Sequence, residues 1–172
     1  MTSDRGLRAR RWCPWCGAAL RPPDGGRQDC TGCGEPLYHN AKPCVAVLLE
    51  DAQGRVLLGR RAVEPELGRW DLPGGFLEPD EEPEDAARRE LREETGTEIE
   101  LTGFLGHVVD RYGAAGDHTL NCVYVGRIAA GEPVAADDVA ELRWFAPAEL
   151  PPREELAFAN TAEALQRWAG AR

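Results

Sequence analysis

Residues 74–96 read GGFLEPDEEPEDAARRELREETG, and this stretch decides the fold that we expect for most of the chain. Nine of its side chains are acidic and three are arginines, which gives a net charge of −6 against −10 for the whole chain. The acids are Glu78, Asp80, Glu81, Glu82, Glu84, Asp85, Glu90, Glu93 and Glu94, and the arginines are Arg88, Arg89 and Arg92. Such a concentration of like charge calls for a structural or chemical reason.

The second half of the stretch has the signals of a helix that begins at Pro83. Proline suits the first helical position because an N–H there would have no helical partner, and Glu84 and Asp85 place negative charge in the electropositive first turn. Thr95 and Gly96 form a stop, because glycine accepts the left-handed conformation at low steric cost. We therefore expect a helix from residue 83 to residue 94 or 95. Its narrow apolar stripe consists of Ala86, Ala87 and Leu91.

Three carboxylates share one face of this expected helix. Glu90, Glu93 and Glu94 stand at positions i, i+3 and i+4, so their Cβ atoms lie within about 5–6 Å of one another. Like charges so placed repel, and a hard divalent cation such as Mg²⁺, which takes carboxylate oxygens as ligands, removes the repulsion. The alternative is a solvated acidic helix face, which is what most charge runs are.

The spacing of the fixed residues distinguishes these alternatives. From Gly75, five residues lead to Glu81, and seven more lead to Arg89, where residues 89–97 read RELREETGT. This pattern resembles the Nudix box: glycine, five residues, glutamate, seven residues, then Arg-Glu-apolar-any-Glu-Glu-any-Gly-apolar. Every fixed position matches except Thr97, where the family prefers a larger apolar residue. Ile99 is a candidate for the missing packing.

The resemblance covers roughly residues 41–172 and implies an α/β fold. Members of the Nudix family form an α/β/α sandwich, a mixed sheet between helices. Apolar runs at 44–50 and 55–60, separated by turn residues, are typical of a hairpin, and 98–110, 117–129 and 140–145 are typical of further strands. Residues 154–169 have helical spacing. We assign no chemistry to Cys44, Cys122 or the lone histidines.

The resemblance also implies a reaction and roles for residues. Nudix enzymes hydrolyse a nucleoside diphosphate linked to another group with the help of Mg²⁺ or Mn²⁺. The ligands and catalytic carboxylates implied are Glu90, Glu93 and Glu94. Arg89 is expected to orient them through charge-assisted hydrogen bonds, and Glu81 to support the metal or the loop. The family often recruits one further acid near a late strand, and here both Asp138 and Glu141 qualify.

Four residues are candidates for contact with substrate. Gly74 and Gly75 are small enough to let backbone approach phosphate closely, and the family commonly uses a carbonyl of this loop as a metal ligand. Tyr112 is the aromatic residue of the loop between the two long strands, a position from which loops often contact substrate. Trp70 is compatible with stacking on a base and equally with packing beneath the glycine loop.

A second metal site is indicated near the start of the chain. Cys13 and Cys16 form one Cys-x-x-Cys pair, and Cys30 and Cys33 form another after thirteen residues. This spacing is typical of a tetrahedral Cys₄ zinc site. Disulfides are disfavoured without a secretory signal, and a redox pair leaves the second pair unexplained. We expect a structural zinc ribbon over residues 12–40, because four thiolates leave no open position for substrate.

Composition limits the possible binding partners and the possible location of the protein. The chain has 172 residues, a net charge of −10 and an isoelectric point near 4.8, which argues against non-specific nucleic-acid binding. No apolar run is long enough for a membrane span, and the N-terminal residues lack the apolar region of a secretory signal. We expect a cytoplasmic protein with a mobile tail (1–11), the ribbon (12–40) and a Nudix domain (41–172).

The substrate class follows only from resemblance. A zinc ribbon before a Nudix domain resembles the NADH pyrophosphatase group, but the Ser-Gln-Pro-Trp-Pro-Phe-Pro segment of that group is absent between Thr97 and Val123. This favours ADP-ribose, FAD or a related dinucleotide over NADH. The alternative is a catalytically weak Nudix-fold module that senses a nucleotide or holds a partner. Many members form homodimers, and no interface is identifiable here.

Overall fold

The computed structural model of the protein describes residues 9–113 and 116–170. The elements, in chain order, are β1 (Arg27–Asp29), β2 (Pro36–Tyr38), β3 (Lys42–Leu49), β4 (Val56–Arg61), β5 (Trp70–Asp71), α1 (Pro83–Thr95), β6 (Glu98–Tyr112), β7 (Asp117–Ala130), β8 (Val139–Phe145), two 3₁₀ turns (Pro147–Glu149 and Arg153–Glu155) and α2 (Ala159–Gly170). The expected mobile tail falls mostly on residues 1–8, which lie outside the described residues.

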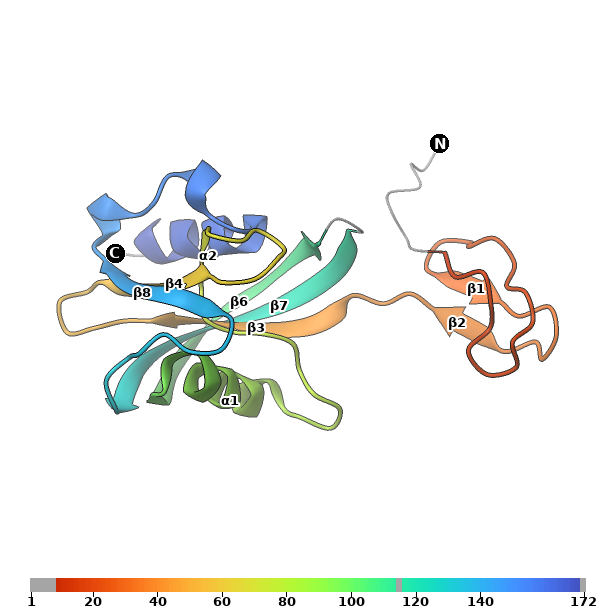
Figure 1. The fold of residues 1–172 in the computed structure, drawn as a ribbon, viewed down its shortest axis with the longest axis horizontal. Helices are drawn as coiled ribbons and strands as arrows, with labels where there is room; N and C mark the ends of the chain where they lie inside the picture. Colours follow the sequence, from red (N-terminus) through yellow and green to blue (C-terminus); the bar gives the residue numbers. More distant parts are fainter. Residues whose placement is uncertain (1–8, 114–115, 171–172) are drawn as a thin grey trace.

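Two three-stranded sheets lie between the two helices, with α1 on one side and α2 on the other (Figure 1). The strand order is β3-β7-β6 in one sheet and β5-β4-β8 in the other. β3 runs parallel to β7, and the remaining pairs in these sheets are antiparallel. The expected α/β/α sandwich with mixed strand directions is therefore confirmed.

β3 connects the two halves of the core because its side chains alternate between them. Val45, Val47 and Leu49 pack in the cluster that contains α1, whereas Ala46 and Leu48 pack in the cluster that contains α2. Successive side chains of a strand point to opposite faces, so a strand covered on both faces is apolar throughout. The helices contribute Ala86, Ala87 and Leu91 to the first cluster and Ala164, Leu165 and Trp168 to the second.

α1 has the bounds expected from its sequence signals. It runs from Pro83 to Thr95 and ends at Gly96, whose φ of 68° is left-handed. Thr97, the departure from the family pattern, is fully buried, and its hydroxyl lies 2.7 Å from that of Thr95. Ile99 is buried in the cluster beneath α1. A pair of threonine hydroxyls and the neighbouring isoleucine thus occupy the space next to the box.

The expected hairpin between the first two long apolar runs is wrong. β3 and β4 belong to different sheets, and only an isolated bridge between Glu50 and Val56 joins them. The turn forms as expected, since the Asp51 carboxylate accepts hydrogen bonds from the N–H groups of Gln53 and Arg55. β3, however, takes β7 as its parallel partner, a pairing between residues far apart in sequence that local patterns do not reveal.

The last helix is shorter than expected. α2 begins at Ala159, whereas helical spacing predicted a start near residue 154. Leu156 forms a parallel bridge with Trp70, and the N–H of Ala157 donates to the Trp70 carbonyl at 2.8 Å, so this segment extends the sheet edge. Within the described ranges, no helix is long and apolar enough to cross a membrane.

β1 and β2 form a small antiparallel unit at one end of the molecule, joined to the rest by the extended segment that enters β3 (Figure 1). Gln28, 2% exposed, organises this unit. Its amide nitrogen donates to the carbonyls of Arg10 and Arg21, and its amide oxygen accepts from the N–H of Arg10. His39 Nε2 lies 2.7 Å from the same oxygen.

Candidate active site

The glycine loop lies against the edge of β3 and admits nothing larger than glycine. The Gly75 carbonyl accepts a hydrogen bond from the N–H of Val45 at 2.8 Å. A Cβ on Gly74 would lie 2.2 Å from the Val45 carbonyl oxygen, and a Cβ on Gly75 would lie 2.4 Å from the Glu90 carboxylate. The two glycines therefore let the loop touch the sheet on one side and the carboxylate on the other.

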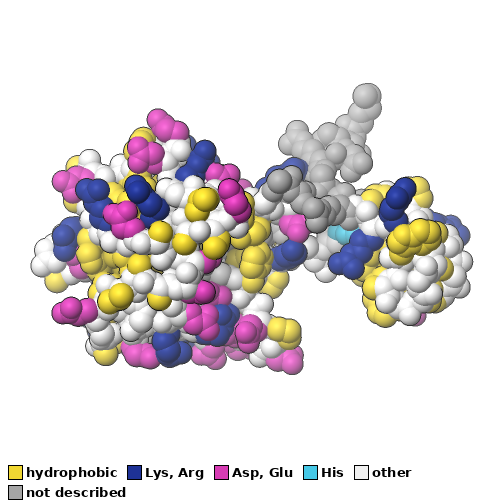
Figure 2. Space-filling model, in the orientation of Figure 1, with side chains coloured by type: hydrophobic (Ala, Val, Ile, Leu, Met, Phe, Trp, Pro, Cys, Tyr) yellow, Lys and Arg dark blue, Asp and Glu magenta, His cyan; other side chains and the backbone are white. Residues whose placement is uncertain are grey.

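Arg89 binds three carboxylates at once. Its Nε and Nη2 donate to the two oxygens of Glu81 at 2.8 and 2.9 Å. Its Nη1 donates to Glu90 at 2.8 Å and to Glu93 at 3.1 Å. This guanidinium lowers the pKa of Glu81 to about 2. Arginine side chains are interspersed with the acids along the edge of the body that carries α1 and its preceding loop (Figure 2).

Glu94 is the buried carboxylate of the site. Only 6% of the residue is exposed, and its Oε2 accepts a hydrogen bond from the Gly74 N–H at 2.9 Å. Burial, followed by the nearby charge of Asp138, raises the pKa of Glu94 well above its usual range. Burial also raises the pKa of Glu90, although Arg89 opposes this shift. Removing a carboxylate from water disfavours its charged form, so these two acids lack a full set of compensating partners.

Asp138 reaches this site because the segment before β8 is hydrogen-bonded to the backbone at the end of α1. The N–H of Ala136 donates to the Glu94 carbonyl at 3.0 Å, and the N–H of Val134 donates to the Thr95 carbonyl at 2.9 Å. The Asp138 carbonyl then accepts a hydrogen bond from the N–H of Ala62 at 2.7 Å. These backbone contacts hold Asp138 in the wall of the cavity that Glu94 also lines.

The remaining candidate acids lie outside that cavity. Glu141 is exposed on β8, where it faces Arg60 in the sheet register, with 3.5 Å between Glu141 Oε2 and Arg60 Nη1. Of the two late acids, the structure therefore brings Asp138 and not Glu141 to the glutamates. Glu81 and Glu93 both bind Arg89, and neither lines the cavity.

The cavity itself has a volume of about 470 Å³ and is lined by two chemically different groups of side chains. Glu90, Glu94 and Asp138 line one part. Phe76, Tyr112 and Phe158 line another, with ring centroids 5.3 Å apart for Phe76 and Tyr112 and 5.4 Å apart for Tyr112 and Phe158. The first part suits a phosphate bound with cations, and the aromatic part suits a planar ring.

Trp70 and Tyr112 differ in their positions. Trp70 is 3% exposed, packs edge-to-face on Phe145 at 5.0 Å between centroids and does not line the cavity. Stacking on a base, one of its two open roles, is incompatible with this burial. Tyr112 does line the cavity. Sequence reasoning missed the two phenylalanines of the cavity, Phe76 and Phe158, because no fixed position of a motif marks them and they meet only in the folded chain.

The donor set fits a hard divalent cation. Glu90, Glu94 and Asp138 offer carboxylate oxygens in one cavity, and two of these acids have raised pKa values that a bound cation would reverse. Oxygen donors of this kind suit Mg²⁺ and Mn²⁺. The Glu93 side chain is 47% exposed and is held by Arg89, so its carboxylate is accessible from solvent.

The four N-terminal cysteines fit a zinc ion. Within residues 9–113 and 116–170, they are the only group of three or more His, Cys, Asp or Glu whose ligand atoms all lie within 4.8 Å of one another. The Sγ atoms of Cys16 and Cys30 are 3.4 Å apart, and those of Cys13 and Cys33 are 3.8 Å apart. Zinc–sulfur bonds of about 2.3 Å in a tetrahedron place sulfurs about 3.8 Å apart, whereas a disulfide needs about 2.05 Å.

The family model described as the NUDIX domain matches residues 41–167. The chain belongs to the Nudix family. The ADP-ribose pyrophosphatase of Methanocaldococcus jannaschii is 34% identical to this Nudix chain over 117 residues, which cover 67% of the chain and 68% of that protein. The NAD-capped RNA hydrolase NudC of Deinococcus radiodurans is 29% identical over 153 residues, which cover 84% of the chain and 51% of that protein.

A solved structure also matches beyond the Nudix domain. The NUDIX hydrolase from Nitrosomonas europaea has a TM-score of 0.77 and 27% identity, and the match covers 95% of this chain and 92% of that one. In contrast, the chain spans only 36–51% of the length of several curated relatives that it matches. The shared Nudix fold is therefore well supported.

Proposed function

We propose that this Nudix protein is a Mg²⁺-dependent hydrolase of a nucleoside diphosphate linked to another group. The observation that carries the proposal is the meeting of Glu90, Glu94 and Asp138 in one cavity that also has an aromatic part. A nucleoside diphosphate has the two matching features, charged phosphates and a planar base. The box is intact, which favours hydrolysis over a nucleotide-sensing or partner-binding module.

The carboxylates would hold the cation, and Arg89 would set their positions. Glu90, Glu94 and Asp138, together with the more exposed Glu93, are the proposed ligands of Mg²⁺ or Mn²⁺. When bound, such an ion neutralises charge on phosphate oxygens and lowers the pKa of a water. Arg89 is a positioning residue, since its hydrogen bonds to Glu90 and Glu93 fix the direction of both carboxylates.

The chain's own groups also suit the proton transfer. Water that attacks a phosphorus atom must lose a proton, and a carboxylate with a raised pKa accepts one more readily than an ordinary surface acid. Glu94 has such a pKa when no cation is bound to it, and it is held in place by the Gly74 N–H. Glu94 is therefore assigned as a ligand of the cation or as the proton acceptor, and both roles require its negative charge.

The substrate class rests on the relatives and on one missing segment. The M. jannaschii relative is an ADP-ribose pyrophosphatase, and the D. radiodurans relative is an NAD-capped RNA hydrolase. The segment typical of Nudix proteins acting on NADH is absent between Thr97 and Val123. ADP-ribose, followed by FAD and related dinucleotides, is the preferred assignment. The ribbon at residues 12–40 would carry a structural Zn²⁺.

Replacing Asp138 and Glu141 one at a time tests the proposed set of metal ligands. Asp138→Asn is expected to lower Mg²⁺-dependent turnover of ADP-ribose by roughly 10²-fold or more, because the carboxylate beside Glu94 is lost. Glu141→Gln is the matched control, since its carboxylate faces Arg60 outside the cavity, and its rate should stay within about twofold. Initial rates at several Mg²⁺ concentrations measure both. Equal rates for Asp138→Asn and the parent protein would show that Asp138 is not a ligand of the cation.

A further inference from the structure

Lys42 is the only lysine among the 20 Lys and Arg residues of the chain. It is the first residue of β3 and follows the extended segment that joins the N-terminal unit to the sheets (Figure 1). It is not among the described residues that line the active-site cavity. Its ammonium group nevertheless contacts side chains of two segments, the glycine loop and β7, that form part of the cavity wall.

Two contacts fix the position of this ammonium group. The Nζ atom of Lys42 donates to Asp117 Oδ2 at 2.7 Å. Asp117 is the first residue of β7 and faces Tyr112 in the register of β6 and β7. The same Nζ lies 5.8 Å from the centroid of the Phe76 ring, within the distance of about 6 Å at which an aromatic face attracts a cation. Asp117 therefore anchors the ammonium group, and the ammonium group attracts the Phe76 ring.

Phe76 is the first of three aromatic rings that follow one another along the cavity wall. The rings of Phe76 and Tyr112 meet edge to face with centroids 5.3 Å apart, and the centroids of Tyr112 and Phe158 are 5.4 Å apart. The guanidinium of Arg61 lies 5.2 Å from the centroid of the Phe158 ring. This aromatic row thus has a cation at each end, Lys42 at one and Arg61 at the other.

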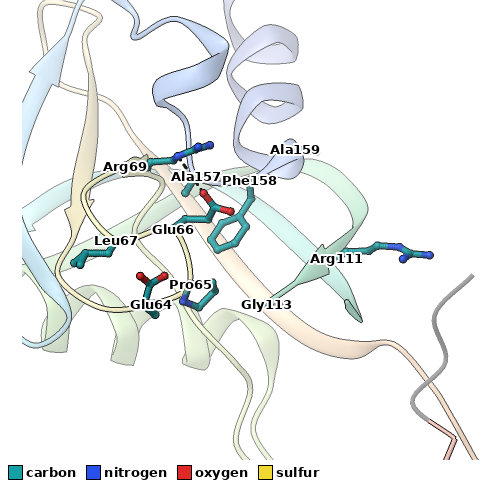
Figure 3. Close-up of a pocket in the computed structure, with 10 residues that line it drawn as sticks. All are labelled: Glu64, Pro65, Glu66, Leu67, Arg69, Arg111, Gly113, Ala157, Phe158 and Ala159. Atoms are coloured by element: carbon teal, nitrogen blue, oxygen red, sulfur yellow. Dashed lines mark ion pairs between the residues drawn. The ribbon is translucent and has the colours of Figure 1, made fainter. Parts of the chain in front are cut away.

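The two ends of the aromatic row differ in how firmly they are held. The Arg61 side chain is 12% exposed, and its Nε donates to the Pro65 carbonyl at 2.7 Å. In Figure 3 the Phe158 ring points toward Pro65, so this end is packed against the β4–β5 loop. At the other end Phe76 is 36% exposed, and the side chain of Lys42 is 55% exposed. Fewer neighbours restrict the Phe76 ring, and its contact with Lys42 therefore matters more.

The backbone of Phe76 is held independently of Lys42. Its carbonyl accepts a hydrogen bond from Arg89 Nη2 at 3.1 Å, and Phe76 also forms an isolated bridge with Cys44. Loss of Lys42 should therefore release the ring and leave the glycine loop in place. The carboxylates that Arg89 orients should keep their positions.

We propose that Lys42 is a positioning residue that holds the Phe76 ring, and through it the aromatic row, in the arrangement that receives the planar base of the substrate. This inference rests on the proposed function and adds to it a residue outside the cavity. A ring that is already in place loses less freedom when a ligand binds, which strengthens binding. Lys42 should therefore affect the affinity for the substrate and not the chemical step.

Replacing Lys42 by methionine tests the inference, because methionine keeps most of the length of the side chain and removes its charge. For Lys42→Met we expect the KM for ADP-ribose to rise roughly three- to tenfold while kcat stays within about twofold, as for loss of an exposed ion pair and a cation–π contact. Calorimetry with AMP in EDTA should show the same loss of affinity without turnover. Arg127→Met is the matched control, since it removes an exposed cation that pairs with Glu100 outside the cavity, and both constants should remain at their parental values.

A double-mutant cycle shows whether Lys42 acts through the ring. In a Phe76→Leu background, Lys42→Met should change the affinity for AMP by less than about twofold, because the ring that Lys42 holds is already missing. Losses of affinity that simply add in the double variant would overturn the inference.

Chemical modification provides a second test that needs no substitution. Reductive methylation and acetylation both modify the single lysine and the N-terminal amine, but only acetylation removes their charge. The methylated protein should bind AMP within about twofold of the parent, whereas the acetylated protein should match Lys42→Met. In Lys42→Met itself the two treatments should give equal affinities. Equal AMP affinities for the methylated and acetylated parent protein would contradict the role of the ammonium charge.

The AMP measurements also separate this inference from the proposed hydrolysis. Weaker AMP binding by Lys42→Met, in a protein that hydrolyses nothing, would support the inference and refute the proposed function. Normal Mg²⁺-dependent hydrolysis, with the KM and the AMP affinity of Lys42→Met unchanged, would do the reverse. A parent protein that does not bind AMP would overturn the inference, because the aromatic row would then not receive a base.

Discussion

Glu94→Gln is expected to reduce Mg²⁺-dependent turnover by about 10²–10⁴-fold, the range typical for loss of a general acid–base group. In the parent protein the Gly74 N–H donates to Glu94 Oε2 at 2.9 Å. The amide of the variant keeps the size of the side chain and an oxygen that can accept this hydrogen bond. It removes the negative charge that either role of Glu94 needs. Steady-state rates of phosphate-product release measure the effect.

The same substitution is expected to leave the fold intact or to stabilise it. Burial and the charge of Asp138 disfavour the ionised form of Glu94, as its raised pKa shows, and a neutral amide avoids this penalty. The Tm should therefore be unchanged or higher. Glu98→Gln, which removes an exposed carboxylate just after α1, is the control and should keep normal activity. Parental turnover in Glu94→Gln would refute the role of Glu94.

Removal of zinc is expected to unfold the N-terminal unit and to spare the Nudix domain. Apparent zinc-binding free energies of roughly 10–16 kcal/mol account for the folding of comparable small units. Both main hydrophobic clusters consist of residues from 45 to 169, so neither depends on the cysteines. Hydrogen exchange after treatment with a strong chelator should show lost protection in residues 12–40 and retained protection in the sheets.

Metal analysis provides the control for this experiment. The parent protein should contain about one zinc per chain, and Cys30→Ser should lose it together with the protection of residues 12–40. Cys122→Ser removes a thiol from β7, far from the cluster in sequence, and should retain full zinc content. Fresh, reduced parent protein that contains no zinc and still protects residues 12–40 would contradict the zinc assignment.

Features encoded by neighbouring residues were predicted well from the sequence. The bounds of α1 follow from Pro83 and Gly96, and these residues act within one turn of the helix ends. The cysteine cluster follows from the spacing of two Cys-x-x-Cys pairs, which the structure brings together with Cys16 Sγ 3.4 Å from Cys30 Sγ and Cys13 Sγ 3.8 Å from Cys33 Sγ. Both predictions rest on short sequence motifs.

Features that depend on distant partners were predicted poorly. Local patterns gave a hairpin for β3 and β4, yet β3 pairs with β7, more than seventy residues away. The choice between Asp138 and Glu141 depends on the backbone hydrogen bonds that residues 134 and 136 make with the end of α1. Local sequence patterns do not predict these contacts. Phe158 and Arg61 were missed for the same reason, because their contact joins the end of β4 to the residues before α2.

The central claim is Mg²⁺-dependent hydrolysis of a nucleoside diphosphate derivative. Its most direct test is phosphate-product release by zinc-loaded, folded protein, with Mg²⁺ and with EDTA, across ADP-ribose, FAD, NAD, NADH, diadenosine polyphosphates and nucleoside triphosphates. The account predicts turnover that requires Mg²⁺ and is fastest for ADP-ribose or another substrate with a group at each end of its pyrophosphate. Absence of turnover on every compound would contradict it.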